Sequence, residues 1–275
     1  MNMYWLEQTE ADVPAENDWL SANEAVCLNG MRFAKRRTDW RLGRWTAKRA
    51  LAVCLDVPAH PQVFKKMDIR PAPSGAPEVF FVNQPATVTI SLSHRAGIAA
   101  CAVAMSGAEM GCDLEMVEPR SDAFVADYFT IEEQALVARA SAADRARLLA
   151  LLWSGKESAL KALHAGLRLD TRCVIVSPIA ASFDLNGWSP LRVRYIGGQV
   201  FHGWWQLGDN ILRTVVAAPP PDSPIPLTIP AHFFDSAARC DNLVSAGDSV
   251  GGNEVRLRGG RKRNLFRAES GTASL

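Results

Sequence analysis

Two short runs, about forty positions apart, carry the side chains of this chain that could do chemistry. The first is residues 111–115 (GCDLE), and the second is residues 153–161 (WSGKESALK). If the first forms a strand and the second a helix, three carboxylates and a lysine can converge on one divalent cation and a phosphate. Hard cations such as Mg²⁺ bind a few carboxylates together with phosphate oxygens and water. The pattern therefore favours an enzyme of phosphate chemistry.

The first run lies on a predicted strand. Residues 110–116 alternate in polarity, so Asp113 and Glu115 project from the same face, with their Cα atoms roughly 7 Å apart. On its own, such a pair is typical of an exposed polar face as well as of a metal site. Three elements are predicted just upstream: a strand at 88–92, a turn at 93–97 and a strand at 98–105.

The second run lies on a predicted helix. A capping signal at Ser141 predicts a helix over about 142–164, with Gly166 as its stop. Glu157 and Lys161 are four residues apart and share one face of that helix. Alone, they could form an ordinary helical ion pair contributing about 0.2–0.5 kcal/mol.

Composition predicts a folded, cytoplasmic protein. The 275 residues are 48% apolar with a net charge of +1, which allows a substantial core and gives no general attraction to nucleic acid or membrane. No segment approaches about 18 uninterrupted apolar residues, so no membrane-spanning helix is expected. The six cysteines form no C-x-x-C pair, and we expect reduced thiols.

The order of predicted elements indicates an α+β fold with two halves that divide near residue 107. The expected segments are an N-terminal lobe at 1–106, a C-terminal lobe with the metal site at 107–218, and a Pro-, Gly- and Arg-rich tail at 219–275. The tail begins with a proline-rich stretch that predicts a stiff linker. Its basic cluster at 256–263 is interpreted as solvated and flexible.

Further polar residues could bind a phosphate. Seven Lys and Arg residues lie between positions 35 and 49, a pattern typical of a solvated basic helix but also of a site for a polyphosphate. Ser93 and His94 add a hydroxyl and an imidazole, which could bind phosphate or form a hydrogen-bonded pair in a turn.

These residues together carry a resemblance to a known family. Residues 111–115 and 153–161 resemble the G-x-D-x-E and W-x-x-K-E-x-x-x-K signatures of the Sfp-type 4′-phosphopantetheinyl transferases. Residues 91–94 (SLSH) resemble the family's N-x-S-H turn, and residues 36–48 resemble its coenzyme-binding helix. The resemblance covers about residues 30–217 in the family's order. One departure is residues 75–77 (GAP) in place of Gly-Lys-Pro, for which Arg70 or the basic cluster is expected to compensate.

The resemblance implies a fold of two similar α/β lobes related by a pseudo-twofold, with coenzyme A between them. It also implies the reaction. The 4′-phosphopantetheine group passes from coenzyme A to a serine of an apo acyl or peptidyl carrier protein, with Mg²⁺ bound, and 3′,5′-ADP leaves. A monomer is expected, because one chain encloses its own cleft.

The resemblance also implies roles for individual residues. Glu157, as general base, and Lys161 are expected to be catalytic. The expected Mg²⁺ ligands are Asp113, Glu115 and Glu157. The expected coenzyme-binding residues are Arg37, Arg44, Lys48, Ser93, His94, Asp113 and Lys161.

Two other functions remain open from the sequence. One is a Mg²⁺-dependent nuclease, although such enzymes place their Glu-x-Lys motif on a strand and the near-neutral charge disfavours duplex binding. The other is a non-catalytic module that binds coenzyme A or a carrier protein.

Overall fold

The computed structural model describes residues 1–105, 107–179 and 187–229, and their elements fall within one compact unit. The described part has mixed α/β architecture with six α-helices and three sheets. The helices are α1 (Ala22–Gly30), α2 (Ala34–Cys54), α3 (Pro61–Phe64), α4 (Asp122–Tyr128), α5 (Ile131–Arg139) and α6 (Ala142–Ala162). The strands are β1 (Tyr4–Thr9), β2 (Met67–Pro71), β3 (Pro77–Phe81), β4 (Gln84–Pro85), β5 (Thr89–Arg95), β6 (Ile98–Ala104), β7 (Glu109–Met116), β8 (Val174–Pro178), β9 (Ser189–Tyr195), β10 (Val200–Gly208), β11 (Ile211–Ala218) and β12 (Ile225–Pro226).

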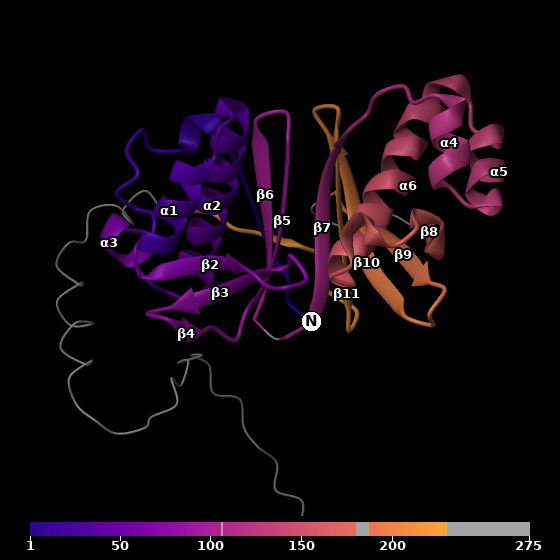
Figure 1. The fold of residues 1–275 in the computed structure, drawn as a ribbon. Coiled ribbons are helices and arrows are strands. Elements are labelled where there is room, and N and C mark those ends of the chain that lie inside the picture. The colour runs from indigo at the N-terminus through magenta and orange to yellow at the C-terminus, as the bar shows by residue number, and fades with distance from the viewer. Residues whose placement is uncertain (106, 180–186, 230–275) are drawn as a thin grey trace, which may run out of the picture. The chain divides into compact units, whose positions relative to one another are not determined.

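Two of the sheets end in strands that lie beside each other. The first sheet has the order β12-β1-β6-β5, and the second has the order β7-β11-β10-β9-β8. All pairs are antiparallel except β1 with β12. Strands β5 and β7 are the neighbouring edges, near the centre of the view in Figure 1. The third sheet, β2-β3-β4, lies beside helix α3.

Each sheet is covered by a long helix, and the two sheets share a core. Helix α2 packs on β1, β5 and β6, whereas α6 packs on β7, β8, β9 and β11. Alternate residues of β1, β6, β7 and β11 point away from these helices into a common cluster, in which β6 contributes Ala100, Ala102 and Ala104. Small alanine side chains allow the strands from the two halves to approach closely. Cys112 and Leu114 belong to this cluster, so the predicted alternation of β7 is confirmed.

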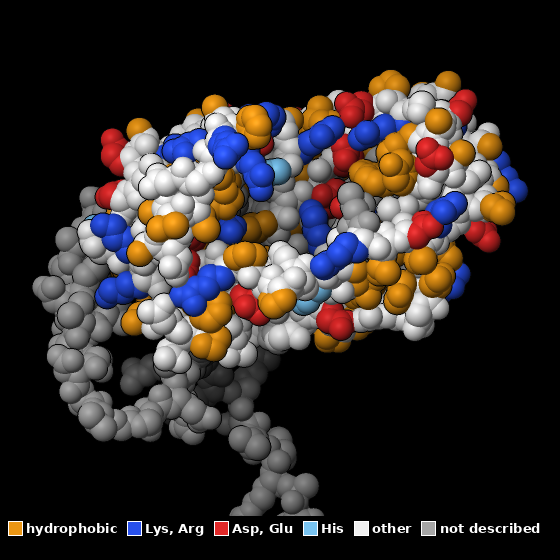
Figure 2. All heavy atoms as spheres, viewed as in Figure 1, with side chains coloured by type: hydrophobic (Ala, Val, Ile, Leu, Met, Phe, Trp, Pro, Cys, Tyr) orange, Lys and Arg blue, Asp and Glu red, His pale blue; other side chains and the backbone are white. Residues whose placement is uncertain are grey.

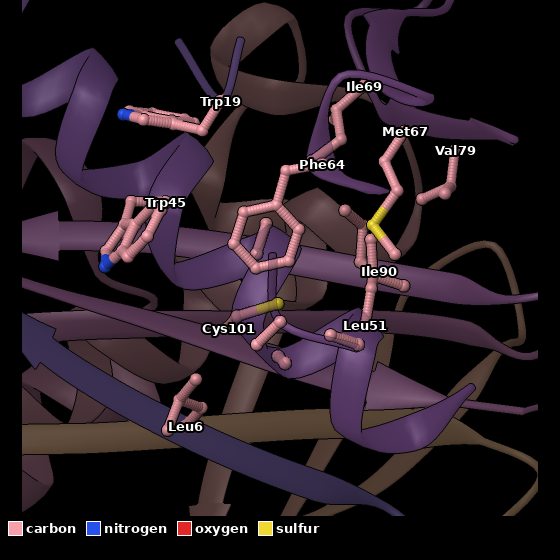
Figure 3. Close-up of a cluster of buried hydrophobic side chains, with 14 of the residues drawn as sticks. Leu6, Trp19, Trp45, Leu51, Phe64, Met67, Ile69, Val79, Ile90 and Cys101 are labelled. Carbon is pink, nitrogen blue, oxygen red and sulfur yellow. The ribbon is translucent and has the colours of Figure 1, made fainter. Parts of the chain in front are cut away.

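The first half has its own aromatic core. Trp45 of α2 packs edge-on against Trp19 and Phe64, with ring centroids 5.1 and 5.3 Å apart. Figure 3 shows these rings together with aliphatic side chains from the strands, among them Leu6 and Ile90. Edge-to-face ring pairs add about 0.5–1.5 kcal/mol beyond their buried area. This core fixes α2 against the first sheet.

The predicted helix that carries the candidate lysine ends earlier than expected. Ser141 caps α6 by accepting a hydrogen bond from the Asp144 amide, as predicted. The helix stops at Ala162, two residues before the predicted end, because His164 takes a left-handed conformation with φ of 53°. The expected stop at Gly166 is therefore wrong, and that residue begins a short 3-10 turn instead.

The predicted turn at 93–97 is also wrong in its first three residues. Strand β5 continues through Arg95, and the turn consists of Ala96 and Gly97, both with positive φ. A two-residue turn with positive φ at both positions matches the twist of the flanking strands. As a result Ser93 and His94 lie on a strand, paired with Ala100 and Ala99 of β6.

The segment predicted as a tail begins as part of the first sheet. Ile225 and Pro226 pair with Tyr4 and Trp5 of β1, and the Leu227 amide donates to the Trp5 carbonyl at 2.7 Å. The later part of that segment, including the basic cluster at 256–263, lies outside the described residues.

Two further features of the described ranges are the polarity of the helices and the state of the cysteines. Helices α2 and α6 have 21 residues each, but neither they nor any other helix there is apolar enough to cross a membrane. Cys27, Cys54, Cys101, Cys112 and Cys173 are free thiols. Burial raises the pKa of the Cys54 thiol to about 12.

Each half contains a fully buried lysine paired with a glutamate. In the first half Lys48 of α2 lies 2.5 Å from Glu24 of α1, and in the second Lys156 of α6 lies 2.7 Å from Glu133 of α5. All four side chains are at most 2% exposed. Burial lowers the pKa of both lysines, and the paired carboxylates oppose that shift. Such a pair fixes the long helix against its neighbour.

The remaining hydrogen bonds of the two pairs also correspond. The Lys48 ammonium donates to the carbonyls of Trp19 and Phe64, and the Lys156 ammonium donates to those of Thr171 and Val174. Each glutamate closes a capping box at the start of its helix and accepts a hydrogen bond from a strand amide, Ile69 for Glu24 and Val176 for Glu133. Satisfied buried charges of this kind specify one arrangement of helix and strand.

We expect Lys156→Met to destabilise the protein by about 3–5 kcal/mol, because it leaves the Glu133 carboxylate buried without its partner. Urea denaturation measures the free energy of unfolding. The matched control is Lys35→Met, which breaks a pair with Asp39 in which the lysine side chain is 84% exposed. That control should cost no more than about 0.5 kcal/mol.

Adding Glu133→Gln to Lys156→Met removes the unpaired charge and should recover part of the loss. Equal, small losses for Lys156→Met and Lys35→Met would contradict the assigned role of the buried pair.

Candidate functional site

Helix α6 contacts strand β7 directly at Gly111. A Cβ atom at this position would lie 1.9 Å from the Ser158 carbonyl oxygen and 2.7 Å from the Ala162 nitrogen. Only glycine therefore allows the two backbones to lie this close. The contact brings Lys161 over β7, where its Nζ donates to the Cys112 carbonyl at 2.8 Å and to Asp113 Oδ1 at 2.9 Å.

The two predicted metal ligands on β7 are both buried and both paired. Asp113 and Glu115 are each 7% exposed. Asp113 accepts hydrogen bonds from Lys161 and from the Ser93 hydroxyl, each at 2.9 Å. Glu115 Oε1 lies 3.0 Å from the Arg120 guanidinium and 3.4 Å from that of Arg95. Burial lowers the pKa of Lys161, but Asp113, Cys112 and Glu157 together raise it above its usual value, so this lysine stays charged.

Glu157 is the one acid of the three without such a partner. Its side chain is half-buried one helical turn before Lys161, and it makes no hydrogen bond or ion pair with another described residue. Burial and the nearby Asp113 and Glu115 carboxylates raise its pKa, against the opposing effect of Lys161. Burial likewise raises the pKa of Glu115. An unpaired carboxylate with a raised pKa is suited to accept a proton.

The three acids have the chemistry of a divalent-cation site. Asp113, Glu115 and Glu157 supply hard oxygen donors, and the electrostatic effect of the other two on Glu157 shows that the acids are close enough to repel each other. A cation would relieve that repulsion. The side chains are not arranged as ligands here: the described ranges contain no group of three or more His, Cys, Asp or Glu residues placed to hold a metal.

A cavity of about 920 Å³ lies next to Lys161. Its walls come from the β2–β3 loop, β3, β5, the start of β7 and the end of α6, so it lies between the two halves of the unit. Arg44, Lys161 and His164 are the basic side chains that line it. Figure 2 shows basic side chains gathered around a hollow in the face that is viewed. The volume lies within the range of small-molecule and cofactor sites.

Three of the other predicted residues, Arg44, Ser93 and His94, lie at or near this region. Arg44 lines the cavity and stacks 4.9 Å above the Trp40 ring. Ser93 bonds to Asp113. Burial lowers the pKa of His94, and the charged groups near it come from both halves, Lys35 and Asp39 of α2 together with Lys161 and Asp113. Arg37 is partly buried, and its guanidinium donates to the Leu28 and Met31 carbonyls at the end of α1.

Lys48 does not belong to this group. Its side chain is fully buried and its ammonium is held by Glu24 and two carbonyls. This position contradicts the coenzyme-binding role expected for Lys48, which stabilises the first half instead. Arg70, expected to compensate for a missing lysine, bonds to Asp68 and Asn83 and is not among the cavity residues.

Sequence reasoning missed several residues of the region. Arg95 and Arg120 neutralise Glu115, and nothing in their local sequence indicates that pairing. Arg168 follows α6 and donates to the Ser74 carbonyl at 2.7 Å, which links the end of α6 to the β2–β3 loop at the cavity. The hydrophobic and turn pattern gave no signal for this long-range contact.

Comparison with known proteins gives a match in the second half of the unit. Residues 109–218 match the family model of the 4′-phosphopantetheinyl transferase superfamily. The matched segment runs from β7 to β11 and contains Asp113, Glu115, Glu157 and Lys161. The match supports a transferase whose chemistry is the transfer of phosphopantetheine. No curated protein matches the chain.

We expect Gly111→Ala to push α6 away from β7, because the new methyl group meets backbone atoms that cannot rotate away. Overpacking costs about 1–3 kcal/mol, and a contact of this closeness should reach the upper end of that range. Urea denaturation provides the measurement. Gly30→Ala is the matched control, because a Cβ there meets no atom within 4 Å.

The control should change the free energy of unfolding by less than about 0.5 kcal/mol. If the two alanine variants were equally stable, the close contact at Gly111 would not be needed for the fold.

Proposed function

We propose that this protein transfers the 4′-phosphopantetheine group of coenzyme A to a serine of an apo acyl or peptidyl carrier protein, as Sfp-type enzymes do. The observation that carries the proposal is Glu157, an unpaired and half-buried carboxylate one helical turn before Lys161, which pairs with Asp113 and lines a cavity of about 920 Å³. The match over residues 109–218 supports the same chemistry.

The proposed reaction needs a base and positive charge beside the phosphates, and we assign these roles to Glu157 and to Lys161 with Mg²⁺. Glu157 takes the proton of the carrier serine hydroxyl, directly or through one water. The serine oxygen then bonds to the β-phosphorus of coenzyme A, and the bond from that phosphorus to the bridging oxygen breaks, which releases 3′,5′-ADP. Lys161 neutralises charge on the phosphate oxygens. The enzyme itself supplies no nucleophile.

Mg²⁺ would be held by Asp113 and Glu157, with Glu115 nearby. When bound, it supplies charge neutralisation at the pyrophosphate. Glu115 is already paired with Arg95 and Arg120, so it would need to leave them to act as a ligand. Arg37, Arg44 and His94 are the proposed contacts of the nucleotide phosphates. Lys48 is left out because it is buried with Glu24.

We further propose that the two halves, 1–106 and 107–218, are lobes related by a pseudo-twofold. The corresponding buried pairs support this. Lys48 with Glu24 joins α2 to α1, and Lys156 with Glu133 joins α6 to α5. Each glutamate also accepts a hydrogen bond from the amide of a strand residue. The cavity between them is built from one chain, which favours a monomer.

The test is incubation of the protein with coenzyme A, Mg²⁺ and a panel of apo carrier proteins, followed by mass spectrometry of the carrier. The proposal predicts a mass gain of one phosphopantetheine. Unmodified carriers, together with cleavage of DNA in a parallel assay, would favour the nuclease. Unmodified carriers, together with binding of coenzyme A by this protein, would favour the non-catalytic module.

Glu157→Gln should lower the rate of transfer by roughly 10²–10⁴-fold, because the amide cannot accept the proton. Coenzyme A binding, followed by calorimetry, should be retained. Glu132→Gln is the matched control, since this glutamate is exposed on α5 and should leave the rate unchanged. Transfer at the wild-type rate by Glu157→Gln would rule out Glu157 as the base.

Removal of divalent cations should stop the transfer. Adding a chelator in excess is expected to abolish the mass gain, and adding back Mg²⁺ is expected to restore it, because the carboxylates of the site need a cation between them and the pyrophosphate. Continued transfer after exhaustive chelation would show that Lys161 and the arginines suffice.

A further inference from the structure

The two edge strands β5 and β7 are joined by side-chain hydroxyls. Ser91 Oγ accepts a hydrogen bond from the Cys112 amide at 2.9 Å, and Ser93 Oγ accepts one from the Leu114 amide at 3.1 Å. The other edge of β7 pairs with β11 through its backbone. Buried amides at a strand edge need acceptors, and the two serines supply them at successive positions of the same face.

The two serines differ in where they donate. Ser91 is 3% exposed; its hydroxyl accepts from the Cys112 amide and its carbonyl accepts from the Cys112 thiol, so neither of these partners is an acid. The Ser93 hydroxyl donates its proton to Asp113 Oδ1 at 2.9 Å. A hydroxyl has a single proton to donate, so Ser93 cannot also donate to a phosphate while it holds this bond.

The Ser93 bond determines which oxygen of Asp113 is left for a ligand. Lys161 Nζ bonds to the same oxygen, Oδ1, at 2.9 Å. Asp113 Oδ2 has no hydrogen bond to another described residue. Two donors on one oxygen fix the orientation of the carboxylate and leave the other oxygen available.

We infer that Ser93 is a positioning residue, which holds Asp113 so that Oδ2 is presented to the divalent cation. This inference rests on the proposed function and assigns Ser93 a role different from the phosphate contact that the resemblance implies. Groups that orient a metal ligand are commonly worth 10–100-fold in metal affinity. Ser91 joins the same strands without touching an acid, which makes it the matched control.

The test compares Ser93→Ala, Ser93→Thr and Ser91→Ala. Mn²⁺ affinity is measured by electron paramagnetic resonance in the presence of coenzyme A, coenzyme A affinity by calorimetry, and stability by urea denaturation. Both alanine variants lose one acceptor for a β7 amide, so both should unfold at lower urea concentration. Ser93→Ala alone should weaken Mn²⁺ binding, by about 10–100-fold.

Ser93→Thr keeps the hydroxyl and should restore Mn²⁺ affinity, and coenzyme A affinity should change little in either Ser93 variant. Equal Mn²⁺ affinity in Ser93→Ala and Ser91→Ala would overturn the inference. So would a loss of coenzyme A affinity in Ser93→Ala without a loss of Mn²⁺ affinity, which is the result expected of a phosphate contact. Failure of the proposed function looks different, because the wild-type protein would then modify no carrier.

Discussion

The close approach of helix α6 to strand β7 is the constraint on which the rest of this region depends. At Gly111 the backbone of the helix occupies the space of an ordinary side chain, with the Ser158 carbonyl 1.9 Å from where a Cβ would be. Lys161 can reach Asp113 and Glu157 can face the β7 carboxylates only because the two elements lie so near. The glycine of the first run is thus as necessary for the acid cluster as the acids themselves.

The three acids Asp113, Glu115 and Glu157 are not equally neutralised by basic side chains. This difference indicates which of them acts as a base and which binds a cation. Glu115 is paired with two arginines and Asp113 with Lys161, whereas Glu157 has no partner among the described residues. In a partly dry environment an unpaired carboxylate holds a proton more readily, and its pKa rises. A base is therefore expected at Glu157, and a cation is expected to bind where Asp113 presents its free oxygen.

The local sequence pattern predicts the strand and the helix that carry the candidate site, but it does not predict which distant residues contact them. Alternation in β7 and the cap at Ser141 depend on neighbours in sequence, and both are confirmed. The predicted turn at 93–97 was wrong because the turn needs only Ala96 and Gly97. Lys48 was misassigned because its partner Glu24 is on another helix, although its spacing from Trp45 and Ala52 places it on the buried face of α2. The arginines around Glu115 are brought there by the fold and have no local signal.

The most direct test of the account is a crystal structure of the protein with coenzyme A and Mn²⁺, in which anomalous scattering locates the metal. The account predicts an anomalous peak between Asp113 Oδ2 and the Glu157 carboxylate, with the coenzyme pyrophosphate beside Lys161 and the Ser93 hydroxyl still bonded to Asp113. A metal peak away from these two acids, or coenzyme A bound outside the cavity between the halves, would contradict it.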